Sequence, residues 1–125
     1  PGTKSFTATC TGKLVGGGCS CPNDENGIDE SYPVPASTWR CTCSEKSASN
    51  EGFAICINKP IVVAHRTDKP CPPGHLLLAG GCQGYSALSR SAPADWAKGT
   101  WGCKGFTSAS QPHKHVLCAK MQQGN

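Results

Sequence analysis

Two stretches of the chain decide its fold: CTGKLVGGGC at residues 10–19 and CPPGHLLLAGGC at residues 71–82. Each stretch runs from a cysteine through a turn and an apolar segment to a glycine-rich step and a second cysteine. Similar landmarks follow in the same order, namely Ser31, Pro33, Trp39, Cys41 and Cys56 after the first stretch and Ser91, Pro93, Trp101, Cys103 and Cys118 after the second. The four matched cysteines are offset by 61 to 63 residues. Such a steady offset indicates an internal duplication.

The composition predicts that covalent bonds replace a large apolar core. Leu, Ile, Val and Phe make up only 18 of the 125 residues, which is about 14% and below the roughly 20% at which a packed core becomes doubtful. The ten cysteines form an even set, as is typical of small secreted domains held by disulfides. Metal binding is the competing use, but the cysteine pairs at 19 and 21 and at 41 and 43 have C-x-C spacing, whereas zinc ribbons favour two intervening residues. We therefore expect a secreted, extracellular protein with five disulfides, no metal site and no cofactor.

The duplication also predicts which cysteines are bonded to each other. Cys21 and Cys43 have no counterpart in the second copy, where Gly84 and Gly105 stand at the matching positions. Two cysteines that are absent together are expected to be bonded partners, and the shared cysteines should bond alike in both copies. The expected bonds are then Cys21–Cys43, Cys10–Cys56, Cys19–Cys41, Cys71–Cys118 and Cys82–Cys103. A rival wiring, Cys19–Cys43 with Cys21–Cys41, stays open if the two C-x-C segments are antiparallel neighbours.

Short segments with β-branched or aromatic residues, bounded by turn-forming residues, predict strands. They include residues 5–9, 38–43 and 52–57, and residues 62–64 should open the second copy as its first strand. A helix has almost no room, and residues 83–90 are its one weak candidate. We expect an all-β fold of two tandem, small, disulfide-braced, β-sandwich-like repeats, residues 1–61 and 62–125. The repeats should share an interface because neither has much core alone.

The order of a cysteine, a Pro-Gly turn, an apolar run, Gly-Gly or Gly-Cys, Ser-x-Pro, Trp and a closing Ala-Ile-Cys is similar to a module of secreted bacterial proteins. It also resembles the Cys/His-rich C-terminal domain of a subtilisin/kexin-type proprotein convertase and the membrane-binding C-terminal β domain of apicomplexan perforin-like proteins. The resemblance implies small β-sandwich subdomains with internal disulfides, often three around a pseudo-threefold axis. It further implies binding of proteins, lipids or glycans, with no catalytic residues. This chain departs from that pattern in having two copies.

Charge is divided unequally between the two copies. Residues 1–61 carry five basic and six acidic side chains, whereas residues 62–125 carry seven basic and two acidic ones together with all four histidines. A positive second copy favours an acidic partner, which we expect to be a cell-surface glycan, an acidic lipid or a protein, with no specific nucleic acid. Trp96 has no counterpart in the first copy and stands in a polar loop near Lys98, so it is the candidate apolar contact. The other basic residues predicted to contact the ligand are Arg66, Arg90 and Lys104.

These features favour a secreted, non-enzymatic binding or adhesion module that acts mainly through loops of the second repeat. In one alternative, the chain is a structural or assembly unit of a larger secreted complex, for which a homo-oligomer is one form. In another, His113 and His115 serve with a lysine as acid, base and phosphate anchor of a small ribonuclease-like toxin. The signatures of the common hydrolases and nucleotide-binding enzymes are missing, so we expect no enzyme.

Other notable residues have simpler interpretations. Trp39 and Trp101 each precede a cysteine by two residues, so they should pack beside that cysteine's disulfide on the same strand face. The acidic residues at 24, 25, 29 and 30 flank Asn26-Gly27. Carboxylates at such spacing could hold calcium, but the EF-hand pattern is absent, and we expect a solvated turn.

Overall fold

The computed structural model describes residues 3–22, 26–35 and 37–121, and within these ranges the chain forms strands and no helix. The strands are β1 (Thr3–Thr9), β2 (Lys13–Ser20), β3 (Ile28–Val34), β4 (Thr38–Ser47), β5 (Glu51–Ile57), β6 (Ile61–Thr67), β7 (Leu76–Asp95) and β8 (Thr100–Met121). The predicted all-β, disulfide-rich fold is confirmed. The described ranges accordingly offer no helix that could cross a membrane.

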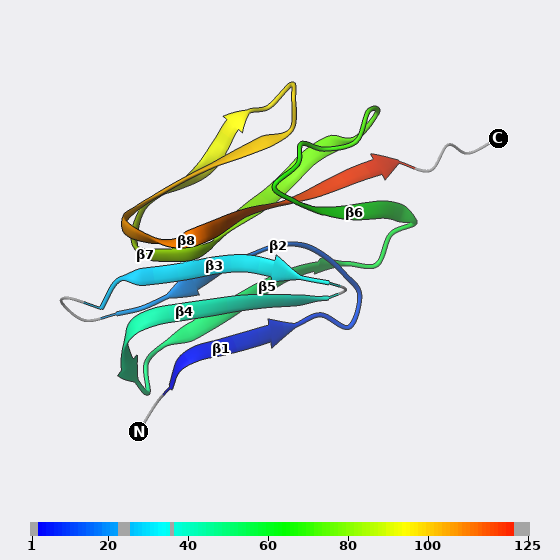
Figure 1. The fold of residues 1–125 in the computed structure, drawn as a ribbon. Helices are drawn as coiled ribbons and strands as arrows, with labels where there is room; N and C mark the ends of the chain where they lie inside the picture. The colour runs from blue at the N-terminus through cyan, green and yellow to red at the C-terminus, as the bar shows by residue number, and fades with distance from the viewer. Residues whose placement is uncertain (1–2, 23–25, 36, 122–125) are drawn as a thin grey trace.

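The strands form two antiparallel sheets (Figure 1). The larger sheet has the order β1-β4-β3-β7-β8-β6, and the smaller one consists of β2 and β5. In the larger sheet, strands of the first repeat occupy one half and strands of the second repeat the other. The halves meet where Ser31 of β3 pairs with Cys82 of β7. The long hairpin of β7 and β8 curls, and its tip lies at the top of the view in Figure 1.

The duplication predicted from the cysteines recurs in the strand pairing. Leu14 of β2 pairs with Cys56 of β5, and Leu77 of β7 pairs with Cys118 of β8. A register shift follows each of these leucines. A bulge at the same place in both repeats shows that the shared sequence pattern encodes a shared backbone path.

Strands β7 and β8 each combine two strands of the first repeat. Ser31 on β3 pairs with Cys41 on β4, and the equivalent Ser91 pairs with Cys103 on the same β7–β8 hairpin that holds Leu77 and Cys118. The first part of β7 thus corresponds to β2 and its second part to β3. Likewise, β8 corresponds to β4 followed by β5.

Residues 83–90, the weak helix candidate, belong to β7, so that expectation was wrong. Gly84 and Ala87 have φ values of 84° and 52°, which no right-handed helix allows. Tyr85 and Ser86 between them pair with Ser108 and Thr107 of β8. The positive φ values bend the strand where the first repeat has its loop between β2 and β3.

The first strands of the two repeats have different neighbours. β1 pairs with β4, for example through Phe6 and Cys41. β6 pairs instead with the C-terminal part of β8, the equivalent of β5, for example through His65 and Leu117. Residues 62–64 do lie in a strand, as predicted, although its pairing differs from that of residues 5–9. As a result, β5 pairs with β2 alone among the strands of the described chain.

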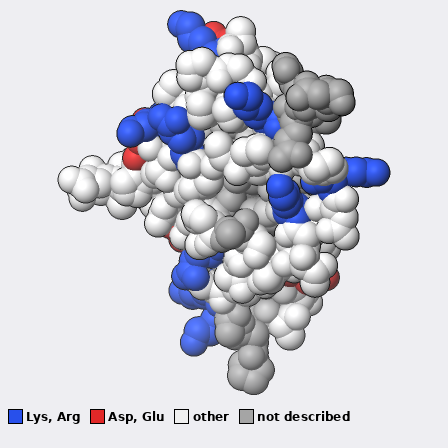
Figure 2. Space-filling view, turned by 90° about the vertical axis from the view of Figure 1, so that its right-hand side faces the viewer, with Lys and Arg blue, Asp and Glu red and all other residues white. Residues whose placement is uncertain are grey.

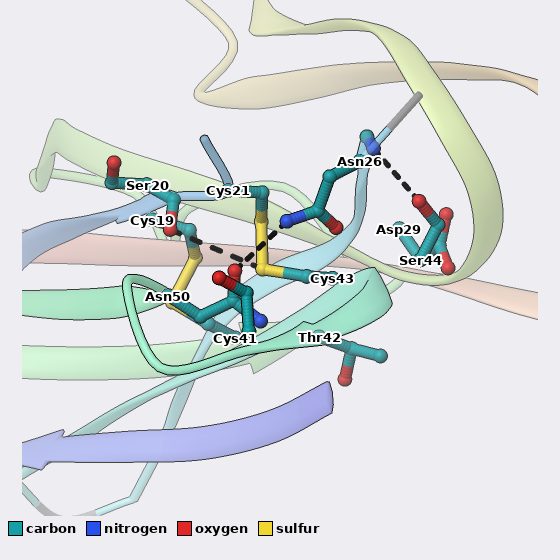
Figure 3. The surroundings of a disulfide bond; sticks show 12 residues. Cys19, Ser20, Cys21, Asn26, Asp29, Cys41, Thr42, Cys43, Ser44 and Asn50 are labelled. Carbon is teal, nitrogen blue, oxygen red and sulfur yellow. Dashed lines mark hydrogen bonds between the residues drawn. A yellow bond between two sulfur atoms is a disulfide. The ribbon is translucent and has the colours of Figure 1, made fainter. Parts of the chain in front are cut away.

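All ten cysteines are bonded. The bonds are Cys10–Cys56, Cys19–Cys41, Cys21–Cys43, Cys71–Cys118 and Cys82–Cys103. Of the two wirings considered for the C-x-C segments, the structure therefore has the first. In Figure 3, the two bonds of these segments lie next to each other. Both join the end of β2 to β4, the layer that faces it.

A buried asparagine closes the loop beside these two bonds. Asn26 is only 6% exposed, and its Nδ2 donates to the Asn50 side-chain oxygen at 2.9 Å and to the Pro22 carbonyl at 2.8 Å. Its Oδ1 accepts a bond from the Glu45 backbone N–H at 2.9 Å, and Figure 3 shows the bond between the side chains of Asn26 and Asn50. Asn26 and Gly27 therefore do not form the solvated turn that was expected. The Asn26 side chain holds this segment instead, because a buried amide must satisfy its donors and acceptors internally.

Each of the paired tryptophans lies against a glycine of its own repeat. A Cβ atom at Gly17 would lie 2.4 Å from the Trp39 ring, and one at Gly80 would lie 2.2 Å from the Trp101 ring. Only a residue without a side chain leaves room for the indole here. The glycine-rich steps seen in the sequence therefore serve to seat the two tryptophans.

The two indoles make equivalent hydrogen bonds but differ in burial. Nε1 of Trp39 donates to Ser31 Oγ at 2.9 Å, and Nε1 of Trp101 donates to Ser91 Oγ at 3.0 Å. Trp39 is 2% exposed and belongs to the same apolar cluster as Cys41, which fits the predicted packing beside the disulfide. Trp101 is only half-buried.

The repeats share their main core. Its buried residues are Cys10, Leu14, Trp39 and Cys41 from the first repeat and Leu117 from the second. Val63 and Leu78 of the second repeat pack against it. In addition, the Lys13 ammonium donates to the carbonyl of Ile61, the first residue of β6. The expected shared interface between the repeats is present.

Candidate functional site

Trp96, the candidate apolar contact, lies in the turn 96–99 between β7 and β8 and is 65% exposed. Asp95 shapes the turn, since its Oδ1 accepts the Lys98 N–H at 3.1 Å and its carbonyl accepts the Gly99 N–H at 2.9 Å. Gly99 has a φ of 71°, a backbone conformation that favours glycine. The chain therefore folds into a tight turn with the tryptophan side chain in solvent.

This turn is anchored to the neighbouring disulfide. The Cys71 N–H donates to the Gly99 carbonyl at 3.0 Å, and a Cβ at Gly99 would lie 2.5 Å from Cys71 Cβ. Cys71 is in turn bonded to Cys118 of β8. Because the support of Trp96 is already ordered, a ligand that contacts it would pay little conformational entropy.

The predicted basic residues lie in three places. Lys98 shares the turn of Trp96, and Arg90 and Lys104 are cross-strand neighbours on β7 and β8. Arg90 precedes Trp96 by six residues, or about 20 Å along an extended strand. Arg66 lies on β6, at the other side of the second repeat. The structure brings Trp96 close to Lys98 and Arg90 close to Lys104, but it does not unite the five in one patch.

The wider distribution of charge agrees with this arrangement. On the face shown in Figure 2, lysine and arginine side chains stand in several separate groups, with few acidic side chains among them. Attraction to an anionic surface would then come from several groups acting at a distance rather than from one dense basic patch.

Four large apolar side chains that the sequence pattern did not single out are exposed. Phe106 on β8 is 87% exposed, and Leu76 at the start of β7 is 69% exposed. Phe53 and Ile55 on β5 are 50% and 58% exposed. The residues at the same positions in β8, His115 and Leu117, are buried, so the structure and not the alignment of the two copies shows that the β5 pair is exposed.

A chain of side chains around His115 joins the two repeats. His115 is 5% exposed. Its Nε2 lies 2.8 Å from Gln83 Oε1, and its Nδ1 lies 2.9 Å from Nε2 of His65. The amide oxygen only accepts, so Nε2 of His115 donates and Nδ1 is left to accept from His65. Across the junction, the ring of Tyr32 stacks on His115 with centroids 4.7 Å apart.

This environment favours neutral histidines. Burial lowers the pKa of His115 to about 4, helped by the nearby His65, and burial also lowers the pKa of His65. His115 is therefore uncharged at neutral pH, which leaves its Nδ1 able to accept the hydrogen bond from His65. Sequence reasoning missed this chain because its members are 32 and 50 residues apart.

His113, the second histidine of the ribonuclease-like alternative, has a different partner. Its Nδ1 lies 2.5 Å from the Asp68 carboxylate, and both side chains are substantially exposed, at 40% and 46%. Although burial acts in the opposite direction, hydrogen bonds from His113 and from the Lys114 N–H hold the pKa of Asp68 below its ordinary value. The two histidines are engaged by separate partners, His113 at the surface and His115 in the interior.

The acidic residues Asp29 and Glu30 hold the repeats together. Asp29 Oδ1 accepts the Ala87 N–H at 2.7 Å, and Glu30 Oε2 accepts the Gly84 N–H at 2.7 Å. Residues 24 and 25, the other half of the considered calcium loop, lie outside the described residues. Within the described part of the chain, no three His, Cys, Asp or Glu side chains are grouped so that they could hold a metal ion.

Two clefts lie between the repeats. The first, of about 460 Å³, is lined by residues that include Lys13, Leu14, Pro33, Val63, His65 and Leu117. The second, of about 450 Å³, is lined by residues that include Gly18, Cys19, Trp39, Arg90, Ser91 and Trp101. Of the predicted contact residues, Arg90 lines the second of these clefts.

Comparison with known proteins gives no match to a family model, to a curated protein or to a solved structure. The function proposed below therefore rests on the geometry of the chain itself.

Proposed function

We propose that this protein is an extracellular, non-enzymatic binding module that attaches to an anionic surface through its second repeat. Trp96 is the apolar anchor and Lys98 the nearest cation. The observation that carries the proposal is the exposed indole on a turn that Asp95 and Cys71 fix in place. Tryptophan is one of the residues enriched at the positions that dominate binding energy.

Charge adds attraction at longer range. The second repeat carries seven basic and two acidic side chains, and Arg66, Arg90 and Lys104 stand at other points of its surface. Separate cations of this kind raise the rate at which an anionic ligand arrives more than they raise the affinity of the final contact. The anionic ligand would be a sulfated or sialylated glycan or an acidic lipid headgroup of a cell surface.

An extracellular location is in keeping with the covalent structure. Five disulfides in a domain of 125 residues are typical of proteins that fold in an oxidising compartment. We therefore propose that the protein is secreted and meets its ligand outside the cell.

A binding role also fits the state of the histidines better than catalysis does. His115 is buried and both of its ring nitrogens have partners within the protein. A general base must reach the proton that it removes, and His115 is enclosed. A screen for ribonuclease activity, with His113→Ala as the comparison, tests the alternative directly.

Retention on heparin and co-sedimentation with vesicles that contain phosphatidylserine measure the proposed binding. Trp96→Ala and Lys98→Ala, alone and together, should each reduce binding and leave the thermal midpoint of unfolding unchanged, since both side chains are exposed. Lys46→Ala removes an exposed lysine from the first repeat and serves as the matched control. The two matrices distinguish a glycan ligand from a lipid ligand.

Added salt should weaken the binding of the wild-type protein, because exposed charges are screened. The proposal is wrong if the Trp96→Ala/Lys98→Ala protein binds both matrices as tightly as the Lys46→Ala protein does.

A further inference from the structure

The first of the two clefts lies between β6 and the start of β2. Its floor is made by three almost fully buried residues, Leu14, Pro33 and Leu117. Val63 and His65, two residues apart on β6, face the same side of the strand and form one wall of the cleft. The volume of about 460 Å³ lies in the range of roughly 300–1,000 Å³ that is typical of small-molecule sites. We call this space the aliphatic cleft.

The lining of the aliphatic cleft favours a hydrocarbon chain over a ring. Val34, Pro35 and Val62 complete its apolar part, which therefore consists of aliphatic side chains and prolines. Within the described ranges of the chain, no phenylalanine, tyrosine or tryptophan lines the cleft, so a sugar ring or a flat aromatic ligand finds no side chain on which to stack. A hydrocarbon chain needs no such partner, because it binds through the apolar surface that it removes from water.

The aliphatic cleft has the length of an alkyl chain of medium size. Its lining follows β6 from Val62 to His65, and the Lys13 ammonium lies on the carbonyl of Ile61, just before this segment. From residue 61 to residue 65 a strand rises by about 13 Å. The extended hydrocarbon chain of decanoate spans a similar distance.

A single cation marks one end of the aliphatic cleft. Lys13 lines the cleft, and its bond to the Ile61 carbonyl uses one of the three N–H groups of the ammonium. Among the described residues, no acidic side chain lines the cleft or pairs with this ammonium. Burial lowers the pKa of His65, which favours its uncharged form. A ligand in the cleft therefore meets one positive charge, and an anionic oxygen is the acceptor that an ammonium binds most strongly.

We infer that the aliphatic cleft binds a free fatty acid of medium chain length. Its carboxylate accepts hydrogen bonds from the Lys13 ammonium, and its hydrocarbon chain lies along β6 against Val63 and Leu117. The ligand thus has its charge where the cleft has its cation and its apolar part where the lining is apolar. Affinity should rise with chain length until the cleft is full, because each added CH₂ group buries further apolar surface.

This site is separate from the proposed surface contact. Trp96 and Lys98 lie in the turn between β7 and β8, and neither is among the described residues that line the aliphatic cleft. The cleft takes one small molecule, whereas the turn is proposed to attach to a surface. The inference therefore does not depend on the proposed role of Trp96.

The test is a titration of the purified chain with sodium decanoate below its micelle concentration, followed by NMR of the side-chain methyl groups and the indole N–H groups. The methyl signals of Leu14, Val63 and Leu117 should shift and reach saturation at one decanoate per chain. The indole signal of Trp96 should stay in place. Methyl signals that do not move overturn the inference, and a shift of the Trp96 signal alone would do so while leaving the proposed function intact.

Two analogues test the two parts of the ligand. Decylammonium chloride has a chain of the same length with the opposite charge, and butyrate has the same carboxylate on a much shorter chain. Each should bind at least about tenfold more weakly than decanoate, because the first loses a charge-assisted hydrogen bond and the second most of the buried apolar surface. Binding of either analogue as tight as that of decanoate contradicts the inference.

Variants of the chain locate the site. Lys13→Gln keeps a donor for the Ile61 carbonyl but removes the charge, and it should weaken decanoate binding about tenfold or more. Val63→Phe should block the hydrocarbon chain. Lys46→Gln removes an exposed lysine of the first repeat that does not line the cleft and is the matched control.

Circular dichroism verifies that these proteins are folded, and the comparison of the two lysine variants decides the matter even if Val63→Phe does not fold. The inference is overturned if the Lys13→Gln protein binds decanoate as tightly as the Lys46→Gln protein does.

Discussion

The ring of His115 stacks on the ring of Tyr32 with centroids 4.7 Å apart, and this contact joins one repeat to the other. Protonation of His115 would place a charge in the buried junction and a donor opposite the His65 donor. The junction is therefore sensitive to mild acid.

Stability should fall as the pH is lowered from about 6.5 to about 4. The pKa of His115 is about 4 in the folded protein and near its ordinary value of 6.5 when unfolded, so in this range the unfolded chain binds more protons and folding is opposed. The stabilisation is complete above pH 6.5, and each tenfold difference in proton affinity corresponds to about 1.4 kcal/mol.

Thermal unfolding followed across this pH range measures the effect. His115→Phe installs the side chain found at the matching position 53 and should reduce the pH dependence, leaving the part that comes from the lowered pKa of His65. The pKa of Asp68 is lowered from an already acidic value of 3.8, so its contribution changes below this range. An equally steep pH dependence in the His115→Phe protein would contradict the assignment.

Gly81→Ala and Gly18→Ala form a matched pair at equivalent positions. A Cβ at Gly81 would lie 2.2 Å from a backbone oxygen, whereas at Gly18 it would enter open space. We expect Gly81→Ala to lower the free energy of unfolding by about 1–3 kcal/mol or more, as overpacking does. Gly18→Ala should leave it unchanged or raise it slightly, because alanine restricts the unfolded chain. Urea unfolding of the two variants decides the matter, and equal losses would show that the junction is not as tightly packed as described.

Ser31→Ala and Ser91→Ala test the equivalent hydrogen bonds of the two indoles in two different environments. Loss of Ser31 Oγ would leave the buried Trp39 N–H without its acceptor, which costs about 1–3 kcal/mol. Trp101 is half-buried, so water can replace Ser91 and the loss should be smaller. Chemical unfolding would reveal the order, and a larger loss for Ser91→Ala would contradict it.

Removal of Cys21–Cys43 should leave a folded protein of lower stability. The second repeat lacks this bond and still adopts the shared strand pairing. The bond joins residues 22 apart in sequence, and the chain-entropy model assigns about 3 kcal/mol to a loop of that size. The Cys21→Ala/Cys43→Ala protein should therefore unfold at lower urea with its other four bonds intact by non-reducing peptide mapping. Scrambled bonds in that map would mean that the Cys21–Cys43 bond is needed for correct pairing of the other cysteines.

Much of this fold could be predicted because the cysteines and tryptophans repeat. Cys10 and Cys71 begin equivalent segments, and the glycines before Cys19 and Cys82 leave room for the equivalent tryptophans Trp39 and Trp101. These features are local to each copy, so they can be recognised in the sequence because they recur at a constant offset.

The arrangement of the two copies could not be predicted in this way. β1 and β6 are both short strands, and nothing in their sequences says that one pairs with β4 and the other with the equivalent of β5. The role of His115 was equally hidden, because Tyr32, His65 and Gln83 reach it only after the repeats have packed. Sequence singled out Trp96 because it has no counterpart, and its role in binding stays a prediction, whereas the exposure of Phe106 is seen only in the structure.

The placement of Leu117 has a consequence for how such a module could be inherited or engineered. This side chain is encoded in the last strand of the second repeat but is buried with Trp39 of the first. A protein that consists of one repeat alone would expose part of this apolar core to water. Although the sequence motif recurs once in each repeat, the unit that can be moved into another polypeptide is the two repeats together.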